Sequence, residues 1–477
     1  MNQAETKEQG VASVRRILTT RTATRTAVCA ALALAGLSPL AASALPVIPG
    51  ATGFGTSTPA GRGGKVIRVT TLAESGAGSL KACVDATGPR VCVFEVSGTI
   101  KLSKDFAIRN PKVTIAGQTA PSPGIMLRGG ALLIQASDVL VQHIRVRAGD
   151  DAAGETPENR DALKIEANQG MPIISNIVVD HCSFSWAIDE TASAWRNWDN
   201  ITLSNNIFSE PLNNSTHPKG AHGYGVLFGP VDGHVSFSGN LLAHVVARNP
   251  LSNATNVVIV NNVIYNWKNF GVDLQGQSGK PTKNAVVGNV FVKGPDYSSH
   301  TPVTLRGDDA NGILSGTKVY LEDNTAQGAT SDPWSIASAV FGNLTLANFK
   351  SSTPPSWPSG MTRLPTSGDV TLTTVLKTVG ARPADRDTVD TRVVNDVRNG
   401  TGRIINCVSP NGTARCERNG GGYPTLAQNT RALTLPADPN TVTASGYTNL
   451  ELWLHGMSAD VEGRARKAPA SPVLAAR

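Results

Sequence analysis

The chain has 477 residues, of which 40% are hydrophobic and only 17% are charged, and it contains 47 glycines and 29 prolines. This composition allows a large core with many turns and few surface helices, which argues against a helix-rich protein and favours an all-β fold. The formal net charge of +7 suits an acidic ligand, but no run of Lys and Arg is interleaved with aromatic residues, so a nucleic-acid partner is not expected.

The first 44 residues have the pattern of a secretory signal. Basic residues precede a short apolar segment at 27–37, and Ala42-Ser43-Ala44 forms a small-x-small cleavage site. The apolar segment is too short to anchor the chain in a bilayer, and no second segment of membrane length follows. A retained amphipathic tail is the alternative. We therefore expect removal of residues 1–44 and a secreted (extracellular) protein without a membrane partner.

Five cysteines remain after this segment. Cys83 and Cys92 lie nine residues apart, as do Cys407 and Cys416, so two local disulfides are expected in an oxidising compartment. Cys182 is left over. Because it lies in an apolar, strand-like run, we expect it to be a buried thiol and not a nucleophile.

Short β-rich segments recur from about residue 113 to residue 289, each near an asparagine or a turn. The last asparagines of four later segments are separated by 34, 22 and 27 residues; they are Asn206, Asn240, Asn262 and Asn289. A period with variable insertions is typical of solenoid coils. An asparagine at a tight bend can adopt left-handed angles, and stacked copies can bond one another as a ladder. We therefore predict a single-stranded right-handed parallel β-helix over residues 45–350, in which the asparagines have no catalytic part.

Acidic residues occupy matching places in two successive repeats. Asp161 comes just before a strand-like segment, and Asp189-Glu190 follows one repeat later. Adjacent coils stack about 4.8 Å apart, so such carboxylates can converge on one cation. Ca²⁺ takes about six to eight oxygen ligands and suits this cluster better than zinc, for which ligand types and spacing are missing. Solvated loop carboxylates are the alternative interpretation.

Two basic motifs follow the acidic positions. Lys219 lies in a His-Pro-Lys-Gly segment, and Arg248 begins an Arg-Asn-Pro segment. Together with the Asp180-His181 strand between Asp161 and Asp189, this order resembles the pectate lyases of polysaccharide lyase family one, in particular the secreted bacterial enzymes. The resemblance covers residues 53–290, and more loosely a C-terminal extension at 351–477 that we expect to pack outside the β-helix.

The resemblance implies calcium-dependent β-elimination of (1→4)-α-D-galacturonan (polygalacturonate), which gives unsaturated oligogalacturonides. It implies that Asp161 and Asp189 bind Ca²⁺, with Glu190 as a further acidic ligand. It also implies that Lys219 binds a substrate carboxylate and that Arg248 is the catalytic base. A guanidinium stays protonated in almost every protein, so a charge clamp is the alternative role for Arg248.

Further implications concern residues around these positions. The resemblance makes Asp180-His181 a structural pair beneath the site. The family often has a second acidic ligand where this chain has Ser193, and a second arginine where it has Asn253. These departures imply a weaker calcium site and less tight substrate binding.

Two other functions remain open. A polygalacturonase-like hydrolase would need carboxylates on both sides of the scissile bond, for which His222-Gly223 and Asp308-Asp309 are weak signals. A non-catalytic β-helix adhesin or carbohydrate-binding protein would share the repeats, but would have no reason to place Lys219 and Arg248 beside an acidic cluster. We expect a monomer.

Overall fold

The computed structural model describes residues 45–276, 279–298, 300–307, 314–341, 345–365, 368–409, 416 and 418–465. The expected signal at residues 1–44 and the Asp308-Asp309 pair lie outside these ranges. Among the described helices, none is both long and apolar enough to cross a membrane.

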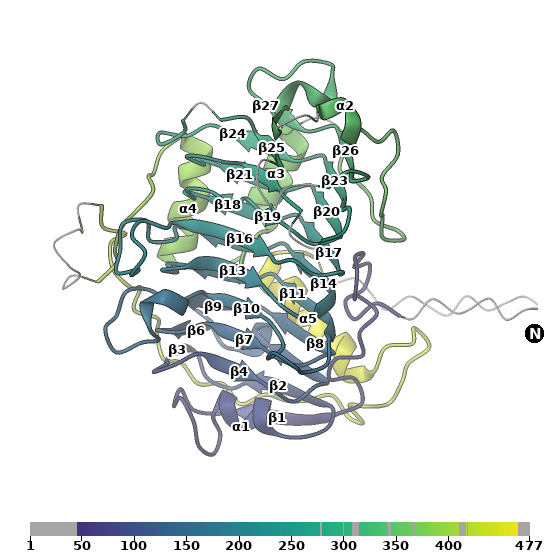
Figure 1. Ribbon diagram of the computed structural model, residues 1–477. Coiled ribbons are helices and arrows are strands. Elements are labelled where there is room, and N and C mark those ends of the chain that lie inside the picture. Colours follow the sequence, from purple (N-terminus) through teal and green to yellow (C-terminus); the bar gives the residue numbers. More distant parts are fainter. Residues whose placement is uncertain are drawn as a thin grey trace, which may run out of the picture. The chain divides into compact units, whose positions relative to one another are not determined.

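In the described part of the chain, the strands form three parallel sheets of ten, nine and nine strands, here called sheets 1, 2 and 3 (Figure 1). From β2 (Arg90–Phe94) onward, each sheet takes every third strand of the chain, so three strands complete one coil. The stacked coils form the right-handed parallel β-helix that the asparagine period predicted.

The strands of each sheet are short and pair in register with the preceding and following coils. Sheet 1 contains β1 (Lys65–Val69), β2, β5 (Val113–Ala116), β8 (Val139–Gln142), β11 (Ile174–Asp180), β14 (Trp198–Ser204), β17 (His234–Ser238), β20 (Asn256–Val260), β23 (Lys283–Val287) and β26 (Lys318–Glu322). Sheet 2 contains β3 (Gly98–Lys101), β6 (Ile125–Arg128), β9 (Ile144–Arg147), β12 (Ser183–Ser185), β15 (Ile207–Ser209), β18 (Leu241–Ala243), β21 (Val263–Tyr265), β24 (Val290–Val292) and β27 (Thr325–Ala326). Sheet 3 contains β4 (Phe106–Ile108), β7 (Leu132–Ile134), β10 (Leu163–Ile165), β13 (Glu190–Ala194), β16 (Tyr224–Phe228), β19 (Leu251–Ser252), β22 (Val272–Leu274), β25 (Val303–Gly307) and β28 (Ala337–Phe341).

The core of the β-helix consists of inward-facing apolar side chains that stack from coil to coil. Phe184 stacks on Phe208 with ring centroids 5.4 Å apart, and Phe208 lies 5.6 Å from Phe237. All three rings are fully buried. Full burial of one such side chain stabilises the fold by about 1.5–3 kcal/mol, so repeated columns of this kind hold the coils together.

An asparagine ladder lines one bend of the β-helix, as the repeats predicted. Asn206, Asn240, Asn262 and Asn289 each donate a side-chain hydrogen bond of 2.9–3.1 Å to the asparagine of the next coil, and the ladder ends at Asn324. The left-handed backbone belongs to the residue before each ladder asparagine: Asn205, Gly239, Asn261 and Gly288 have φ of 55–65°. The sequence prediction had assigned both roles to the ladder residue itself. Separating them lets the side chain point inward.

The cysteines follow the sequence prediction. Disulfides join Cys83 to Cys92 and Cys407 to Cys416. Cys182 is a buried free thiol at the position of a ladder asparagine, and its backbone N–H donates to Asn206 Oδ1 at 2.8 Å. The side-chain ladder therefore begins one coil after Cys182.

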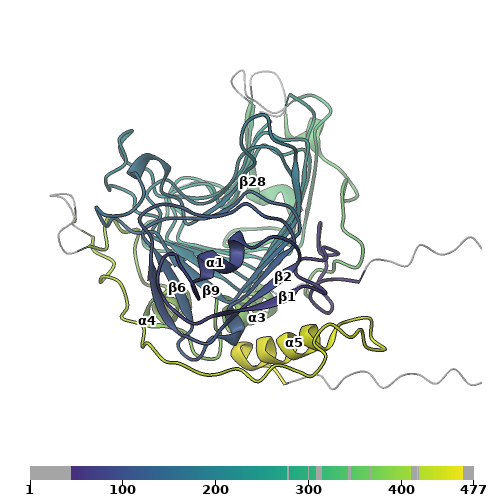
Figure 2. The ribbon, with the colours of Figure 1, turned by 90° about the horizontal axis from the view of Figure 1, so that it is seen from below.

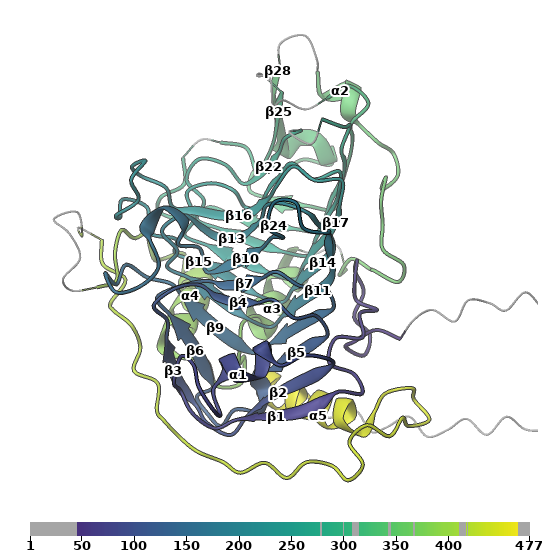
Figure 3. The ribbon, with the colours of Figure 1, turned by 60° about the horizontal axis from the view of Figure 1, so that its bottom comes forward.

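Helices close one end of the β-helix and cover its outside. The described α-helices are α1 (Leu80–Asp85), α2 (Leu346–Phe349), α3 (Gly368–Thr378), α4 (Thr388–Asn399) and α5 (Asn449–Glu462), with 3₁₀ turns at Gly117–Thr119, Pro157–Asn159 and Pro333–Ile336. Seen along the axis of the β-helix, α1 lies inside the outline of the stacked coils and α5 lies outside it (Figure 2). The apolar faces of α3 and α4 pack on sheet 2, and Leu450 and Leu454 of α5 pack on sheet 1. Figure 3 shows the yellow C-terminal segment passing around the first coils.

Candidate active site

A groove of about 780 Å³ runs along the outside of sheet 3, and all five predicted site residues line it. Asp161 precedes β10, Asp189 and Glu190 lie at the start of β13, and Arg248 precedes β19. Lys219 comes from the loop before β16. The parallel stacking of these strands brings residues that are 87 positions apart in sequence into one site.

Backbone bonds between two loops place the acidic residues side by side. The N–H groups of Ile188 and Asp189 both donate to the carbonyl of Arg160, at 2.9 and 3.3 Å. Arg160 is itself buried, and its guanidinium donates to the carbonyls of Gly149 and Asp151, which fixes the loop before β10. Asp161 and Asp189 are therefore held on neighbouring coils by rigid backbone contacts.

The carboxylates of Asp161, Asp189 and Glu190 offer oxygens that all lie within 4.8 Å of one another. Asp161 is only 2% exposed and accepts hydrogen bonds from Ser193 Oγ at 2.5 Å and from the Glu190 N–H at 3.3 Å. Burial raises the pKa of Asp161 well above its ordinary value, and the nearby Asp189 carboxylate raises it further. Burial also raises the pKa of Asp189. Two crowded carboxylates of this kind fit a hard divalent cation.

Ser193 occupies the place where the resemblance leads one to expect a further acidic ligand. Its hydroxyl donates to Asp161 and adds no charge to the cluster. Glu190 does not simply replace the missing acid, because its carboxylate forms an ion pair with Arg248. The described residues thus give the cluster two carboxylates without an arginine partner and one that shares an arginine.

The side chain of Arg248 reaches past the coil that contains Tyr224 and contacts Glu190 on the coil before it. Glu190 is paired in register with Tyr224, and Tyr224 forms a bridge to Ala247 on the following coil. The Arg248 guanidinium lies 4.2 Å from the centre of the Tyr224 ring and bonds to Glu190 beyond it. Arg248 has a left-handed backbone (φ 67°), and burial lowers the pKa of its guanidinium, although the surrounding aspartates oppose this shift.

Lys219 lies at the open side of the groove. Its side chain is 69% exposed, and its ammonium lies 3.2 Å from the exposed carboxylate of Glu158. Such a pair contributes little to stability, so the ammonium can move to another anion at small cost. This freedom suits a residue that binds a charged ligand.

A stacked histidine pair was not predicted as part of this site. The rings of His217 and His222 lie 3.5 Å apart, and their Nε2 atoms are 3.8 and 3.7 Å from Asp189 Oδ1. Burial lowers the pKa of His217, and His222 lowers it further. The two histidines flank Lys219 in sequence, and their closeness to that predicted residue was the available signal.

Arg306 on β25 was also missed. It lines the far part of the groove, bonds to the buried Asp273 at 2.7 Å and lies 4.9 Å from the centre of the Phe270 ring. No motif marked it, since the link between β25 and the site depends on the stacking of coils. Of the two tryptophans near the acidic turn, Trp198 is buried in the core and Trp195 lines the groove.

Asp180 and His181 are not beneath this site. Both lie at the bend between sheets 1 and 2, where Asp180 accepts hydrogen bonds from Gln142, Ser204 and Asn205. His181 faces α5. The prediction that this pair supports the site is wrong because the β-helix has three bends per coil, and sequence adjacency does not tell which bend a residue occupies.

Curated relatives match nearly the whole chain. "Probable pectate lyase C" of Aspergillus fumigatus is 34% identical over 433 residues, which span 87% of this chain and 95% of the relative. The protein of the same name from Emericella nidulans is 31% identical and covers 91% of this chain and 98% of the relative. "Pectate lyase 5" of Ambrosia artemisiifolia is 26% identical over 285 residues, 54% of this chain and 66% of the relative. No family model matches.

The relatives with high coverage are fungal, so the bacterial part of the expected resemblance is not supported. Among solved structures, a pectate lyase bound to a hexasaccharide matches with a TM-score of 0.46 at 15% identity, covering 72% of this chain and 99% of that one. Pectate lyase II of Xanthomonas campestris matches with a TM-score of 0.44 at 16% identity, covering 71% and 100% of the two chains.

Proposed function

This chain belongs to the pectate lyase family, and we propose that it is a secreted enzyme that cleaves polygalacturonate by calcium-dependent β-elimination. The observation that carries the proposal is the meeting of an acidic cluster with Arg248 and Lys219 in one groove. An acidic polysaccharide supplies carboxylates for the cations of this groove, and a bound metal would link it to the acidic cluster. A non-catalytic adhesin gives no reason for this arrangement.

The residues present fit a calcium ion. Asp161 and Asp189 would hold it, because their carboxylates are crowded together and, among the described residues, neither forms an ion pair with an arginine. Glu190 would contribute an oxygen beside its bond to Arg248. When bound, calcium neutralises the uronate carboxylate and so makes the adjacent C5 proton more acidic. The remaining coordination positions would be filled by water and substrate carboxylates.

The protein side chains have separate tasks in the elimination. Lys219, with its exposed ammonium, binds a second uronate carboxylate and sets the register of the polymer. The C5 proton leaves, its electron pair forms the C4–C5 double bond, and the C4–oxygen bond breaks to release the leaving chain, whose oxygen takes up a proton. Arg248 either accepts the C5 proton or holds the developing charge. Burial lowers the pKa of its guanidinium, which makes loss of a proton easier and so favours the role of base.

A product assay tests the proposal. The purified protein is incubated with polygalacturonate, with and without a calcium chelator, and the products are followed by ultraviolet absorbance and by reducing ends. An unsaturated, ultraviolet-absorbing product that disappears on chelation is expected. Reducing ends without that absorbance would indicate a hydrolase, and no cleavage of any uronate polymer would leave a binding protein as the better interpretation.

A further inference from the structure

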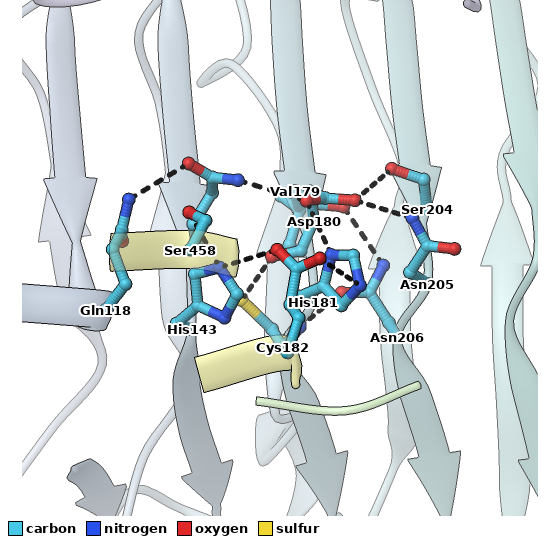
Figure 4. Close-up of polar contacts among 12 residues, drawn as sticks. Gln118, His143, Val179, Asp180, His181, Cys182, Ser204, Asn205, Asn206 and Ser458 are labelled. Carbon is cyan, nitrogen blue, oxygen red and sulfur yellow. Dashed lines mark hydrogen bonds and ion pairs between the residues drawn. The ribbon is translucent and has the colours of Figure 1, made fainter. Parts of the chain in front are cut away.

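A second cluster of side chains of metal-ligand type lies under α5, at the bend between sheets 1 and 2 (Figure 4). His143 and His181 follow β8 and β11 and occupy equivalent bends of adjacent coils, with φ of 59° and 48°. Glu462 is the last residue of α5. All three side chains are buried, and their ligand atoms lie within 4.8 Å of one another.

The ends of α5 fix the position of Glu462. A capping box between Thr448 and Glu451 begins the helix, and Gly463, in the left-handed conformation with φ 67°, ends it. Glu462 thus lies in the last turn, where the helix dipole disfavours a negative charge. A carboxylate at this position is stabilised by a cation, and the two imidazoles face it from the β-helix.

Two of the three ligand pairs are spaced close to the edges of a tetrahedral metal site. His143 Nε2 lies 3.5 Å from Glu462 Oε1, and His181 Nε2 lies 3.6 Å from Glu462 Oε2. Ligands about 2.0–2.1 Å from a tetrahedral Zn²⁺ are roughly 3.3 Å from one another. The ligand atoms of all three side chains lie within 4.8 Å of one another, so the side chains must draw together to share one ion.

The other nitrogen of each imidazole is already fixed. His143 Nδ1 lies 2.8 Å from the carbonyl oxygen of Ala381, and His181 Nδ1 lies 2.8 Å from Asp180 Oδ2. Both partners are acceptors, so each Nδ1 carries a hydrogen and each Nε2 has a lone pair in the neutral ring. The Nε2 of His143 accepts from Ser458 Oγ at 3.1 Å, and an ion at this place would displace that hydroxyl. A carbonyl or carboxylate behind a histidine is the usual outer support of a metal ligand.

An opening to the surface and the side chain of Arg464 bear on access to the cluster. An opening of about 380 Å³, lined by Asp180, His181, Glu462 and Arg464 among others, connects it to the surface and gives an ion a path and room for water. The half-exposed Arg464 side chain bonds to Glu462. It competes for one carboxylate oxygen and can withdraw into solvent.

We propose that His143, His181 and Glu462 bind a Zn²⁺ ion that fastens α5 to the β-helix. Two imidazoles and one carboxylate are ligands that zinc prefers, and a water from the opening would complete the tetrahedron. The groove on sheet 3 offers three carboxylates for a harder ion. The described residues thus carry candidate sites of different ligand chemistry, with Asp189, His217 and His222 as a further group beside the carboxylates, and the site under α5 has no part in the proposed cleavage.

The test measures zinc binding to the purified protein after metal removal, in saturating Ca²⁺, by calorimetry and by metal analysis. We expect wild-type protein to bind zinc and to show slower hydrogen exchange in α5 when zinc is bound. The substitution Glu462→Gln keeps the size of the side chain and should lower zinc affinity at least about 10-fold. It leaves Asp189, His217 and His222 intact, so any zinc held by that group is the same in both proteins.

Arg464→Gln is the matched control on the same segment. It removes a competing cation but no ligand, so zinc should bind at least as tightly as in the wild type. Failure of the wild-type protein to bind zinc would overturn the proposal and leave a protonated histidine as the partner of Glu462. The proposal would also be overturned by equal zinc binding in the Glu462→Gln protein, or by zinc binding that leaves exchange in α5 unchanged.

Discussion

Replacement of Arg248 by lysine separates the chemistry of the groove from the stability of the fold. Lysine keeps a positive charge at the end of a flexible chain, but it loses the planar fork and the stacking on Tyr224, which now lies 4.2 Å from the guanidinium carbon. A left-handed backbone is equally strained for arginine and lysine, so the exchange adds no backbone cost. An ion pair with Glu190 remains within reach of the ammonium.

The structure sets the size of the two effects. Loss of the stacking contact should reduce the free energy of unfolding by about 1 kcal/mol, because the side chain is 25% exposed and the charge is kept. Turnover should fall at least about 100-fold, the scale of losing a positioned base, which corresponds to about 2.7 kcal/mol of transition-state stabilisation. Catalysis should therefore collapse in a protein that remains folded.

The assay compares kcat and KM for polygalacturonate with urea unfolding of the same preparations. Arg306→Lys is the matched control, since Arg306 also pairs with an acid and stacks on an aromatic ring in the same groove. It should lose less, and mainly through KM. A loss confined to KM in Arg248→Lys would mark a uniform binding residue and make Lys219 the next candidate for the base. Full activity would refute the assignment of the site.

Three other outcomes are expected. Chelation should abolish cleavage, and added calcium should restore it. The Asp189→Asn protein should require far more calcium for activity. Activity that survives saturating EGTA would contradict the metal proposal. Asn240→Ala should lower the free energy of unfolding in urea by about 3 kcal/mol, because it leaves buried ladder partners unsatisfied, and a change below about 1 kcal/mol would show that the ladder contributes little. Although burial opposes it, Arg147 holds the pKa of Asp387 at about 2, below its unfolded value of about 3.9. The resulting stability is present above about pH 4 and is lost as the pH falls towards 2, by roughly 2 kcal/mol, and Asp387→Asn should flatten this acid limb in urea unfolding measured across that range.

The fold was predictable because one residue type, the ladder asparagine, recurs in successive coils with the same hydrogen-bonding role. Asn206, Asn240, Asn262 and Asn289 recur once per coil, and each must bond its neighbours because it is buried. Asn324 belongs to the same ladder and follows Asn289 by 35 residues, close to the 34 between Asn206 and Asn240, but it lies beyond the β-rich segments from which the repeat was predicted. The packing of α5 was not predictable in detail, since Glu462 meets His143 only through the folded path of the last segment.

The part of the site that lies on two neighbouring coils could be predicted from the sequence. Asp161 and Asp189 lie before strands of neighbouring coils, and the structure brings their carboxylates together, although the register of the two strands is one residue off from pairing them directly. The bond between Glu190 and Arg248 spans two coils and depends on the intervening ring of Tyr224, which no spacing rule indicates. The stack of His217 on His222 depends on a loop that folds back on itself, so the contact between the two rings could not be predicted from their positions in the sequence.

The stacking of sheet 3 also separates the length of the groove from its chemistry. The predicted calcium and substrate residues come from strands β10 to β19 and the loops before them, so an extra coil inserted in this span would move Arg248 about 4.8 Å away from Asp189. A coil added beyond β25 would leave these residues in place and extend the wall that a polymer touches. Gain or loss of outer coils is therefore a route by which such proteins can acquire grooves for longer or shorter chains while the reacting groups keep their spacing.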